Sequence, residues 1–355
     1  MKALVLAGGT GSRLRPFTHS GTKQLLPIAN KPVLFYGLES IAEAGISEVG
    51  LVVGDYADDI RRAVGDGGSA FGLDVTYIPQ NRPLGLAHAV STARDFLADD
   101  DFLVYLGDNY LQDGVRDFIA RARIRPAAAR LLVTSVPDPS AFGVAEVEET
   151  GRVTRVEEKP VHPRSDLALI GVYAFSPAVH EAVGAIRPSA RGELEITHAV
   201  QWLIDDGQDV LAEETTSVWR DTGSVDDMLE ANRHVLDGLS GRLEGKVDPD
   251  SAVVGRVRLG EGAVVRGSRI TGPVVIGPGS VISNAVIGPY TSIGANCRVH
   301  DSSIEASVLL DGADVECAGR IERSFIGRDA VVAAPRFPYA HRLVLGDHSK
   351  VQLHP

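Results

Sequence analysis

The residues best suited to do chemistry lie near the start of the chain. The short apolar run Ala3 to Ala7 leads into the glycine-rich segment Gly8 to Gly11, and Arg13 and Lys23 follow. Glycine lets backbone N–H groups approach an anion, because it has no Cβ to block them. Arginine binds two phosphate oxygens with its planar fork, and lysine adds a mobile charge. This pattern predicts a binding site for the phosphate chain of a nucleotide.

Two other glycine-rich phosphate loops do not fit this segment. A Walker loop needs a lysine directly after its last glycine, and none follows Gly9 or Gly11. A dinucleotide-binding loop needs a third glycine that opens a helix. Here that glycine is absent, and Arg13, Arg15 and Pro16 stand where the helix would begin. The sequence therefore disfavours both a P-loop enzyme and an NAD-dependent dehydrogenase.

Two aspartates are candidate metal ligands. Asp108 follows the apolar run Phe102 to Leu106, and Asp221 follows the run Ser217 to Trp219. Since ligands of an open α/β sheet bind beyond the carboxyl ends of its strands, we expect both carboxylates to face one crevice. Carboxylate and phosphate oxygens are the ligands that Mg²⁺ prefers in proteins that bind phosphates. The alternative for each aspartate is that it caps a turn or a helix.

Residues 1–240 have the pattern of a sheet flanked by helices, because short Val, Ile and Leu runs alternate with amphipathic stretches. This predicts a Rossmann-like α/β domain with a mixed or parallel sheet. Apolar and polar residues alternate around Glu149 to Gly151, which predicts a β-hairpin. The expected strands are Ala3–Ala7, Val49–Gly54, Val75–Pro79, Phe102–Gly107, Leu131–Val136 and Leu169–Phe175, and the expected helices are Val33–Ala44, Asp58–Val64, Leu86–Leu97, Val115–Ala122, Pro177–Ala185 and Glu195–Asp206.

Residues 241–355 form a second predicted domain with a different pattern. An apolar residue followed by glycine recurs about every six residues, as at Ile276, Ile287, Ile293 and Ile326. Such a period predicts a left-handed parallel β-helix in which each face of a coil is one hexapeptide. The period ends at Pro335, so we expect the last residues to cap the open end of the solenoid. Leu343–Leu345 and Val351–Leu353 are the candidate strands of this cap.

Composition limits the possible partners and compartments. A length of 355 residues suggests two domains, and the net charge of −12 argues against a nucleic-acid surface. The N-terminal apolar run is too short for a signal peptide, and no apolar run approaches the length of a membrane span. Cys297 and Cys317 have no zinc or disulfide spacing, and we expect both to be buried apolar residues. We therefore expect a cytoplasmic protein without nucleic-acid or membrane partners.

Six short sequence blocks occur in a fixed order along residues 1–240. They are Leu6 to Pro16, Lys23 to Pro27, Gly107 to Asn109, Glu157 to Pro160, Arg191 to Thr197 and Trp219 to Gly223. Each block alone is weakly specific, whereas their order is highly specific. With these blocks the sequence resembles the sugar-1-phosphate nucleotidylyltransferases, and most closely the glucose-1-phosphate thymidylyltransferases.

This resemblance implies a role for each matching residue on the nucleotide side. Arg13, Lys23, Asp108 and Asp221 are the expected catalytic residues, with Mg²⁺ as the cofactor held by the two aspartates. A glutamine amide can pair with a ring N–H and a carbonyl of thymine or uracil, but this pattern does not separate the two bases. The expected nucleotide-binding residues are Leu6, Gly8, Gly9, Gly11, Gln24, Gln80 and Gly85.

The resemblance also implies a binding site for the sugar phosphate. Glu158 is expected to contact glucose hydroxyls, while Lys159 and Arg191 are expected to hold the phosphate. Many relatives have tyrosine where Phe142 stands, which leaves the identity of the sugar open. Histidines such as His88 fit packing or surface roles better than catalysis. The expected sugar-phosphate site comprises Asn109, Gly143, Glu158, Lys159, Val172 and Arg191.

The implied reaction is attack of a sugar 1-phosphate oxygen on the α-phosphorus of dTTP, which gives dTDP-glucose and pyrophosphate. No general base is needed, because a phosphate monoester with a second pKa of about 6 is already an anion. One alternative is an enzyme that uses UTP or is bifunctional, with an acyltransferase in the β-helix where His300 lies. Another is a sensor that binds nucleotide-sugars without catalysis. We expect the β-helix to support a homo-oligomer.

Overall fold

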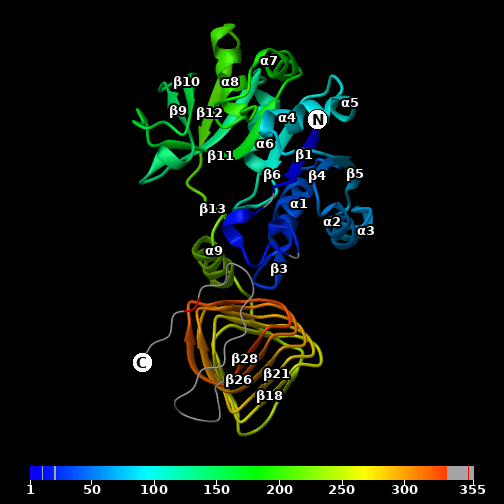
Figure 1. Cartoon of the computed structure of the whole chain (residues 1–355), viewed down its shortest axis with the longest axis vertical. Coiled ribbons are helices and arrows are strands. Elements are labelled where there is room, and N and C mark those ends of the chain that lie inside the picture. The colour runs from blue at the N-terminus through cyan, green and yellow to red at the C-terminus, as the bar shows by residue number, and fades with distance from the viewer. Residues whose placement is uncertain (10, 20, 334–350, 352–355) are drawn as a thin grey trace. The chain divides into compact units, whose positions relative to one another are not determined.

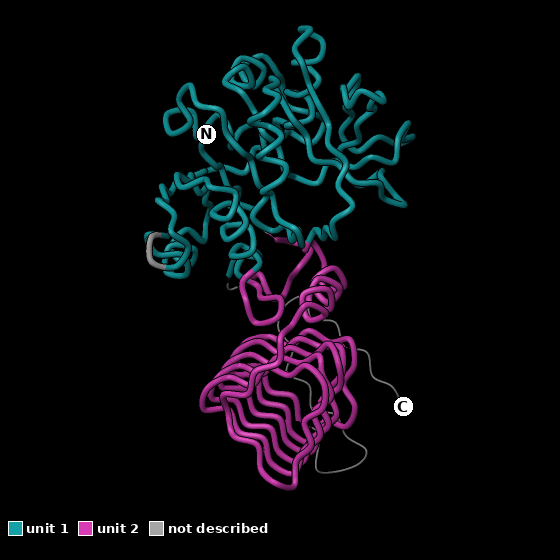
Figure 2. Tube along the Cα trace, turned by 180° about the vertical axis from the view of Figure 1, so that it is seen from behind, with its two compact units in different colours: residues 1–10, 21–25, 33–221 teal, residues 11–20, 26–32, 222–355 magenta. Residues whose placement is uncertain are grey.

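The computed structural model (Figure 1) describes residues 1–9, 11–19, 21–333 and 351. The chain divides into two units, which Figure 2 colours separately. The first contains residues 1–10, 21–25 and 33–221, and the second contains residues 11–20, 26–32 and 222–355. The domain boundary expected at residue 240 stays a prediction.

A mixed sheet forms the centre of the first unit, in the strand order β10-β9-β11-β6-β1-β4-β5, with β8 between β11 and β12. Its central pairs are parallel, as shown by Ala3 opposite Val49. Strand β11 runs antiparallel to β6 and begins the mixed part. The strands are β1 (Lys2–Ala7), β4 (Glu48–Val53), β5 (Asp74–Pro79), β6 (Phe102–Leu106), β8 (Ala129–Ser135), β9 (Gly143–Val147), β10 (Val153–Glu158), β11 (Leu167–Phe175) and β12 (Val210–Glu214).

Helices cover both faces of this sheet. Successive side chains of a strand point to opposite faces, so Leu4 and Leu6 belong to one apolar core while Ala3 and Val5 belong to the other. Apolar residues of α4, α7 and α8 complete the first core, and those of α1, α2 and α6 complete the second. The helices are α1 (Val33–Glu43), α2 (Ala57–Val64), α3 (Gly68–Phe71), α4 (Leu86–Thr92), α5 (Arg94–Leu97), α6 (Arg116–Ile124), α7 (Val179–Ala185) and α8 (Ile196–Asp205).

The predicted α/β pattern is confirmed in its order, with two corrections. The single helix expected over Leu86–Leu97 is wrong, because it divides at Ala93 into α4 and α5. The hydroxyl of Thr92 donates to the His88 carbonyl at 2.8 Å, a bond that bends helices. The predicted hairpin exists as β9 and β10, and β9 joins the main sheet through β11.

The second correction concerns the strand before Asp221. Asp221 does not follow a strand of the main sheet but is the last residue of β13 (Trp219–Asp221). This strand pairs antiparallel with β7 (Asn109–Leu111) in a separate two-stranded sheet. The side-chain pattern of so short a strand does not distinguish a main-sheet strand from a separate ribbon.

A left-handed parallel β-helix, as expected, makes up most of the second unit. Val257 pairs with Val274, which pairs with Thr291, so one coil takes 17 residues there. Three stacked apolar columns fill its interior, one on each face, because the same register places like side chains above one another. The columns are Leu259–Ile276–Ile293–Leu309–Ile326, Val265–Ile282–Val299–Val315 and Ile270–Ile287–Ile304–Ile321.

Strands of the β-helix are short, and most turns lie at residues with positive φ. Cys317 also has a positive φ (52°), within β26, and is exposed, so the expectation that both cysteines are buried is wrong for it. The strands are β14 (Arg242–Leu243), β15 (Lys246–Val247), β16 (Ala252–Val254), β17 (Val257–Leu259), β18 (Val264–Arg266), β19 (Arg269–Thr271), β20 (Val274–Ile276), β21 (Val281–Ser283), β22 (Val286–Ile287), β23 (Thr291–Ile293), β24 (Arg298–Glu305), β25 (Val308–Leu309), β26 (Asp314–Glu322), β27 (Phe325–Ile326) and β28 (Val331–Ala333). The cap strands expected at Leu343–Leu345 and Val351–Leu353 lie outside the described residues, apart from Val351.

Helix α9 (Val225–Asp237), which was not predicted, connects the β-helix to the hairpin β2 (Pro27–Ile28) and β3 (Lys31–Pro32). The Asn232 side chain, 1% exposed, lies at the centre of this junction. Its Oδ1 accepts from the Ala29 N–H at 2.9 Å and from the Ser292 hydroxyl at 2.6 Å, and its Nδ2 donates to the Tyr290 carbonyl at 3.1 Å. These bonds tie segments far apart in sequence into one unit.

Among the described residues, no helix is both long and apolar enough to cross a membrane.

Candidate active site

A pocket of about 240 Å³ lies beyond the carboxyl end of β1 in the first unit. This is the end of an α/β sheet at which ligands bind. The pocket brings together residues that are distant in sequence and were predicted separately for base, phosphate and metal. Its lining is Leu6, Gly8, Gly9, Lys23, Gln24, Gln80, Pro83, Gly85, Leu86, Ala89, Leu106, Asp108 and Glu193.

Glycines keep this pocket open at two places. Gly85 has φ +106°, and a Cβ there would lie 2.4 Å from the Leu194 carbonyl oxygen, so only glycine fits. A Cβ on Gly8 would lie 3.1 Å from Oε1 of Gln80, and one on Gly9 would lie 3.2 Å from Cε of Lys23. The absence of these side chains leaves room beside the polar groups that face the pocket.

Both pocket glutamines have a hydrogen-bond partner. Gln24, 1% exposed, accepts a hydrogen bond from the Thr22 hydroxyl. The Gln80 amide nitrogen lies 2.9 Å from Nδ1 of His88, which follows Gly85 on α4. Thr22 and His88 were not predicted as site residues. The only sequence signal for Thr22 is its position two residues before Gln24.

Lys23 and Asp108 form an ion pair in the pocket. Asp108 is 8% exposed, so its carboxylate is largely removed from water and paired with a cation. On the neighbouring ribbon, Asp221 lies opposite Asn109, the residue after Asp108. Asp108 lies in the turn directly before β7, and Asp221 is the last residue of the strand that pairs with β7.

These two carboxylates fit a Mg²⁺ site of the kind predicted. Mg²⁺ is usually held by one or two protein carboxylates together with substrate phosphates and water. The described residues contain no group of three or more His, Cys, Asp or Glu side chains placed to hold a metal ion, so a site made by protein ligands alone is not formed among them. A metal held by Asp108 and Asp221 would need further oxygen ligands, such as those of a phosphate chain or water.

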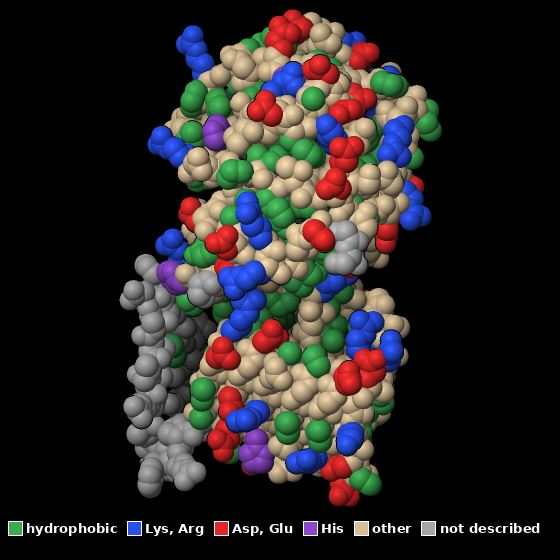
Figure 3. Space-filling model, turned by 90° about the vertical axis from the view of Figure 1, so that its right-hand side faces the viewer, with side chains coloured by type: hydrophobic (Ala, Val, Ile, Leu, Met, Phe, Trp, Pro, Cys, Tyr) green, Lys and Arg blue, Asp and Glu red, His purple; other side chains and the backbone are tan. Residues whose placement is uncertain are grey.

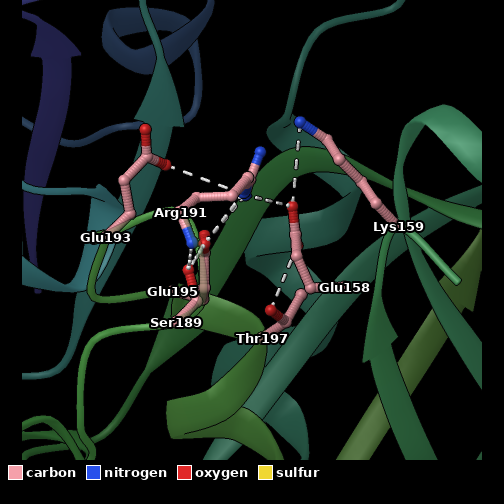
Figure 4. A network of polar contacts seen from close by, with 7 residues as sticks. All are labelled: Glu158, Lys159, Ser189, Arg191, Glu193, Glu195 and Thr197. Atoms are coloured by element: carbon pink, nitrogen blue, oxygen red, sulfur yellow. Dashed lines mark hydrogen bonds and ion pairs between the residues drawn. The ribbon is translucent and has the colours of Figure 1, made fainter.

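A network of carboxylates holds Arg191, as Figure 4 shows. Nη2 of Arg191 lies 2.8 Å from Oε1 of Glu195 and 2.9 Å from Oε1 of Glu158, while its Nε donates to Glu195 at 3.3 Å. Glu195 also accepts from the Ser189 hydroxyl at 2.8 Å, and it is 4% exposed. Burial alone would lower the pKa of Arg191, but the hydrogen bond to Glu195 and the charges of Glu195 and Glu158 outweigh it and raise that pKa. The guanidinium is therefore a fixed positive charge.

The other predicted sugar-site residues surround Glu158. The second carboxylate oxygen of Glu158 accepts from the Thr197 hydroxyl at 3.1 Å, and Nζ of Lys159 lies 4.0 Å from the first. A Cβ on Gly143 would lie 2.7 Å from Cγ2 of Thr197 and 3.4 Å from Oε2 of Glu158. Glu195 and Thr197 belong to the recognised block Arg191 to Thr197, but their individual contacts were not predicted.

Asn109 begins β7, and Val172 lies on β11, which pairs with β6. The Asn109 amide donates to the Ile170 carbonyl, and Val172 is fully buried opposite Tyr105. The Phe142 and Trp219 rings meet edge to face at a centroid distance of 5.4 Å. The indole N–H of Trp219 is buried without a hydrogen-bond partner among the described residues.

Arg13 and Gly11 belong to the second unit, so the structure describes them separately from the pocket. Gly11 is left-handed (φ 62°) and precedes the short 3₁₀ turn Ser12–Leu14 that carries Arg13. The Thr18 hydroxyl donates to the Gly11 carbonyl at 2.8 Å, which closes this segment on itself. A role for Arg13 at the phosphates stays a prediction.

On the face drawn in Figure 3, acidic and basic side chains are interspersed. On this face an anion would therefore be bound by a local set of cations rather than by a broad basic surface.

Three comparisons place the chain among known proteins. The family described as nucleotidyl transferase matches residues 2–238. A glucose-1-phosphate thymidylyltransferase from Streptomyces griseus is 58% identical over 354 residues, and one from Streptomyces antibioticus is 59% identical over 355 residues. Each alignment covers 99% of this chain and 99% of the relative. A solved structure from Bacillus anthracis, provisionally described as a glucose-1-phosphate thymidylyltransferase, has 34% identity and a TM-score of 0.61, and it covers 65% of this chain and 94% of that chain.

Proposed function

Because this chain belongs to the nucleotidyl transferase family, we propose that it transfers a thymidylyl group from dTTP to glucose 1-phosphate. The products are dTDP-glucose and pyrophosphate. The observation that carries this proposal is the single pocket in which Gly8 and Gly9, the Lys23–Asp108 pair and two glutamine amides meet. Near-full-length similarity to two glucose-1-phosphate thymidylyltransferases supports the choice of substrates.

The nucleotide side of the site follows from this pocket. Backbone N–H groups of the glycine segment and the Lys23 ammonium bind the triphosphate, and Gln24, Gln80 and Gly85 lie at the base. Asp108 and Asp221 would hold Mg²⁺, which supplies charge neutralisation on the phosphates when it is bound. Lys23 already compensates part of the Asp108 charge in the described structure.

The sugar phosphate binds through the carboxylate network around Arg191. Arg191 and Lys159 are the cations there, and Glu158 is the carboxylate that pairs with both, so the phosphate and the sugar hydroxyls have separate partners. Lys159 is held by its backbone N–H, which donates to the Phe142 carbonyl at 2.9 Å. Binding of the phosphate at Arg191 competes with Glu158 and frees that carboxylate for hydroxyl groups.

The reaction is a direct displacement. The anionic phosphate of glucose 1-phosphate attacks the α-phosphorus of dTTP, and the bond from that phosphorus to the bridging oxygen of pyrophosphate breaks. Catalysis consists of alignment and charge stabilisation, as in other phosphoryl transfers. Arg13 is the residue we assign to the charge that grows on the departing pyrophosphate. We also propose that the enzyme depends on Mg²⁺, forms a homo-oligomer and is located in the cytoplasm.

Pyrophosphate release across a matrix of substrates tests the proposal. The matrix crosses dTTP, UTP, CTP, ATP and GTP with the 1-phosphates of glucose, N-acetylglucosamine and mannose, in the presence of Mg²⁺. We expect the largest kcat/KM with dTTP and glucose 1-phosphate. A maximum with UTP and N-acetylglucosamine 1-phosphate would keep the chemistry but change the substrate, and it would call for an assay of acetyl-coenzyme A consumption. If no pair of nucleotide and sugar phosphate released pyrophosphate, the alternative of a non-catalytic nucleotide-sugar sensor would remain.

Exchange of labelled pyrophosphate into dTTP tests the direct displacement. Without glucose 1-phosphate we expect no exchange, because no nucleotidyl-enzyme forms. Exchange in the absence of the sugar phosphate would show a covalent intermediate and contradict the mechanism.

A further inference from the structure

Each pocket glutamine uses one end of its amide for a neighbour in the same unit. Oε1 of Gln24 accepts the Thr22 hydroxyl, and both residues are at least 95% buried, since Thr22 is 5% and Gln24 1% exposed. Nε2 of Gln80 lies 2.9 Å from Nδ1 of His88, which accepts it when the imidazole proton is on Nε2. The two amides are therefore held in opposite senses.

The remaining ends of the two amides lie beside the pocket glycines. An added Cβ on Gly9 would be 3.6 Å from Nε2 of Gln24, and one on Gly8 would be 3.1 Å from Oε1 of Gln80. Neither of these atoms has a hydrogen bond to another described residue. The pocket thus presents one N–H donor from Gln24 and one carbonyl acceptor from Gln80.

A donor and an acceptor in fixed places suit one kind of base edge. Thymine and uracil carry a ring N–H beside a carbonyl, so the N–H meets Oε1 of Gln80 while the carbonyl meets Nε2 of Gln24. Guanine offers the same pair on a larger ring. Cytosine and adenine carry a ring acceptor beside an amino group. In the same position, their ring acceptor would face Oε1 of Gln80 and their amino group would face Nε2 of Gln24, so neither pair could form a hydrogen bond.

We propose that Thr22 and His88 are positioning residues that select the base by fixing which end of the Gln24 and Gln80 amides faces the pocket. This inference rests on the proposed function and names the chemistry by which its nucleotide is chosen. The two residues act through the glutamines and need not touch the base.

The hydrogen bonds are needed because the two ends of an amide have almost the same shape. An amide without a partner turns over and offers its other end, so a glutamine alone accepts either class of base. With Thr22 and His88 in place, a mismatched base leaves buried polar groups unpaired, and each such group weakens its binding about 5- to 150-fold. Loss of one of these hydrogen bonds should therefore reduce selectivity by about fivefold or more.

Equilibrium binding of dTTP and dCTP, which differ in the base, tests His88. The measured quantity is the ratio of the Kd for dCTP to the Kd for dTTP, without a sugar phosphate and therefore without turnover. His88→Leu has no acceptor for the Gln80 amide, and we expect this ratio to fall about fivefold or more. His88→Asn places an oxygen near the position of Nδ1, and we expect the ratio to stay within about threefold of the starting protein.

Thr22 offers a matched pair of variants. Thr22→Val keeps the shape but removes the hydroxyl, and we expect the ratio to fall as for His88→Leu. Thr22→Ser keeps the hydroxyl, and we expect it to keep the ratio. A variant that merely loosens the fold would weaken both nucleotides together and leave the ratio unchanged.

The outcomes separate this inference from the proposed function. An unchanged ratio in both His88→Leu and Thr22→Val would overturn the inference, whatever the enzyme activity is. An equal loss in His88→Asn and His88→Leu would also overturn it for His88, because the acceptor would then be irrelevant. Absence of pyrophosphate release from the starting protein would instead overturn the proposed function, and the binding ratio would still test base selection.

Discussion

Replacing Glu195 by glutamine should weaken binding of glucose 1-phosphate while leaving binding of dTTP nearly unchanged. Glu195 is 4% exposed and accepts from two nitrogens of Arg191, at 2.8 Å and 3.3 Å. The substitution keeps the size of the side chain and one oxygen, but it removes the charge that fixes the guanidinium. Arg191 then keeps its pair with Glu158 at 2.9 Å. Its guanidinium is therefore less available to bind the phosphate of glucose 1-phosphate.

The size of the effect follows from these contacts. A hydrogen bond that involves a charged group is worth about 1.5–3 kcal/mol, and part of it survives because glutamine still accepts one N–H. We therefore expect a loss of about 1.4–2.8 kcal/mol in the binding of glucose 1-phosphate, or about 10- to 100-fold in its KM. The KM for dTTP should change by less than about twofold, since Glu195 does not line the nucleotide pocket.

A double-mutant cycle tests whether Glu195 acts through Arg191. The cycle compares the starting protein, Glu195→Gln, Arg191→Gln and the double variant by kcat/KM for glucose 1-phosphate. We expect Glu195→Gln to have almost no effect once Arg191 is absent. In the Arg191→Gln protein it should even raise the melting temperature, because it removes a buried carboxylate that has lost its cationic partner.

Glu157→Gln is the matched control. Glu157 is beside Glu158 on β10, where neighbouring side chains point to opposite faces. It forms an exposed pair with Arg155 at 2.9 Å, and we expect a change below about twofold. The reasoning would be refuted if Glu195→Gln raised both KM values equally, or if it cost as much in the Arg191→Gln background as in the starting protein.

Three further predictions concern other parts of the molecule. Arg13→Ala should lower kcat by about 10²–10³-fold with little change in KM, and an unchanged kcat with a raised KM would show a binding role only. Asn232→Ala should lower the free energy of unfolding by about 2–4 kcal/mol in urea denaturation, because three partners lose the Asn232 amide. Burial lowers the pKa of His180, whose Nε2 is buried without a partner among the described residues. Its neutral form is favoured by folding, so this contribution to stability is full above the ordinary histidine pKa of about 6.5 and is lost as the pH falls through the lower pKa of the folded state. His180→Phe, which keeps the stack on Phe102, should flatten the stability profile between about pH 7 and pH 5, and an unchanged slope would contradict the assignment.

Local patterns predicted much of the fold. Apolar runs located β1, β4 and β6, because buried strands in the parallel part of a sheet are continuous in Val, Ile and Leu, and such runs also located β5 and β8. The recurring Ile–Gly pattern located the β-helix, because each coil repeats the same inward column. The break at Ala93 was missed, since it depends on a side-chain bond from Thr92 rather than on apolar spacing.

The site was predicted less completely. Gly8, Gly9, Lys23, Gln24, Gln80 and Asp108 line one pocket, while their roles at the site stay predictions. Contacts between distant side chains were not foreseen, such as Glu195 with Arg191 and His88 with Gln80, because helix and strand periodicity carries no information on them. Asp221 was misplaced for the same reason, since its partner strand lies more than 100 residues earlier, at Asn109.

Quantifying dTDP-glucose after incubation with dTTP, glucose 1-phosphate and Mg²⁺ tests the central claim most directly. We predict one dTDP-glucose for each pyrophosphate released, with no nucleotide consumed when glucose 1-phosphate is left out. Absence of dTDP-glucose, or dTTP consumption that does not depend on the sugar phosphate, would contradict the proposed transfer.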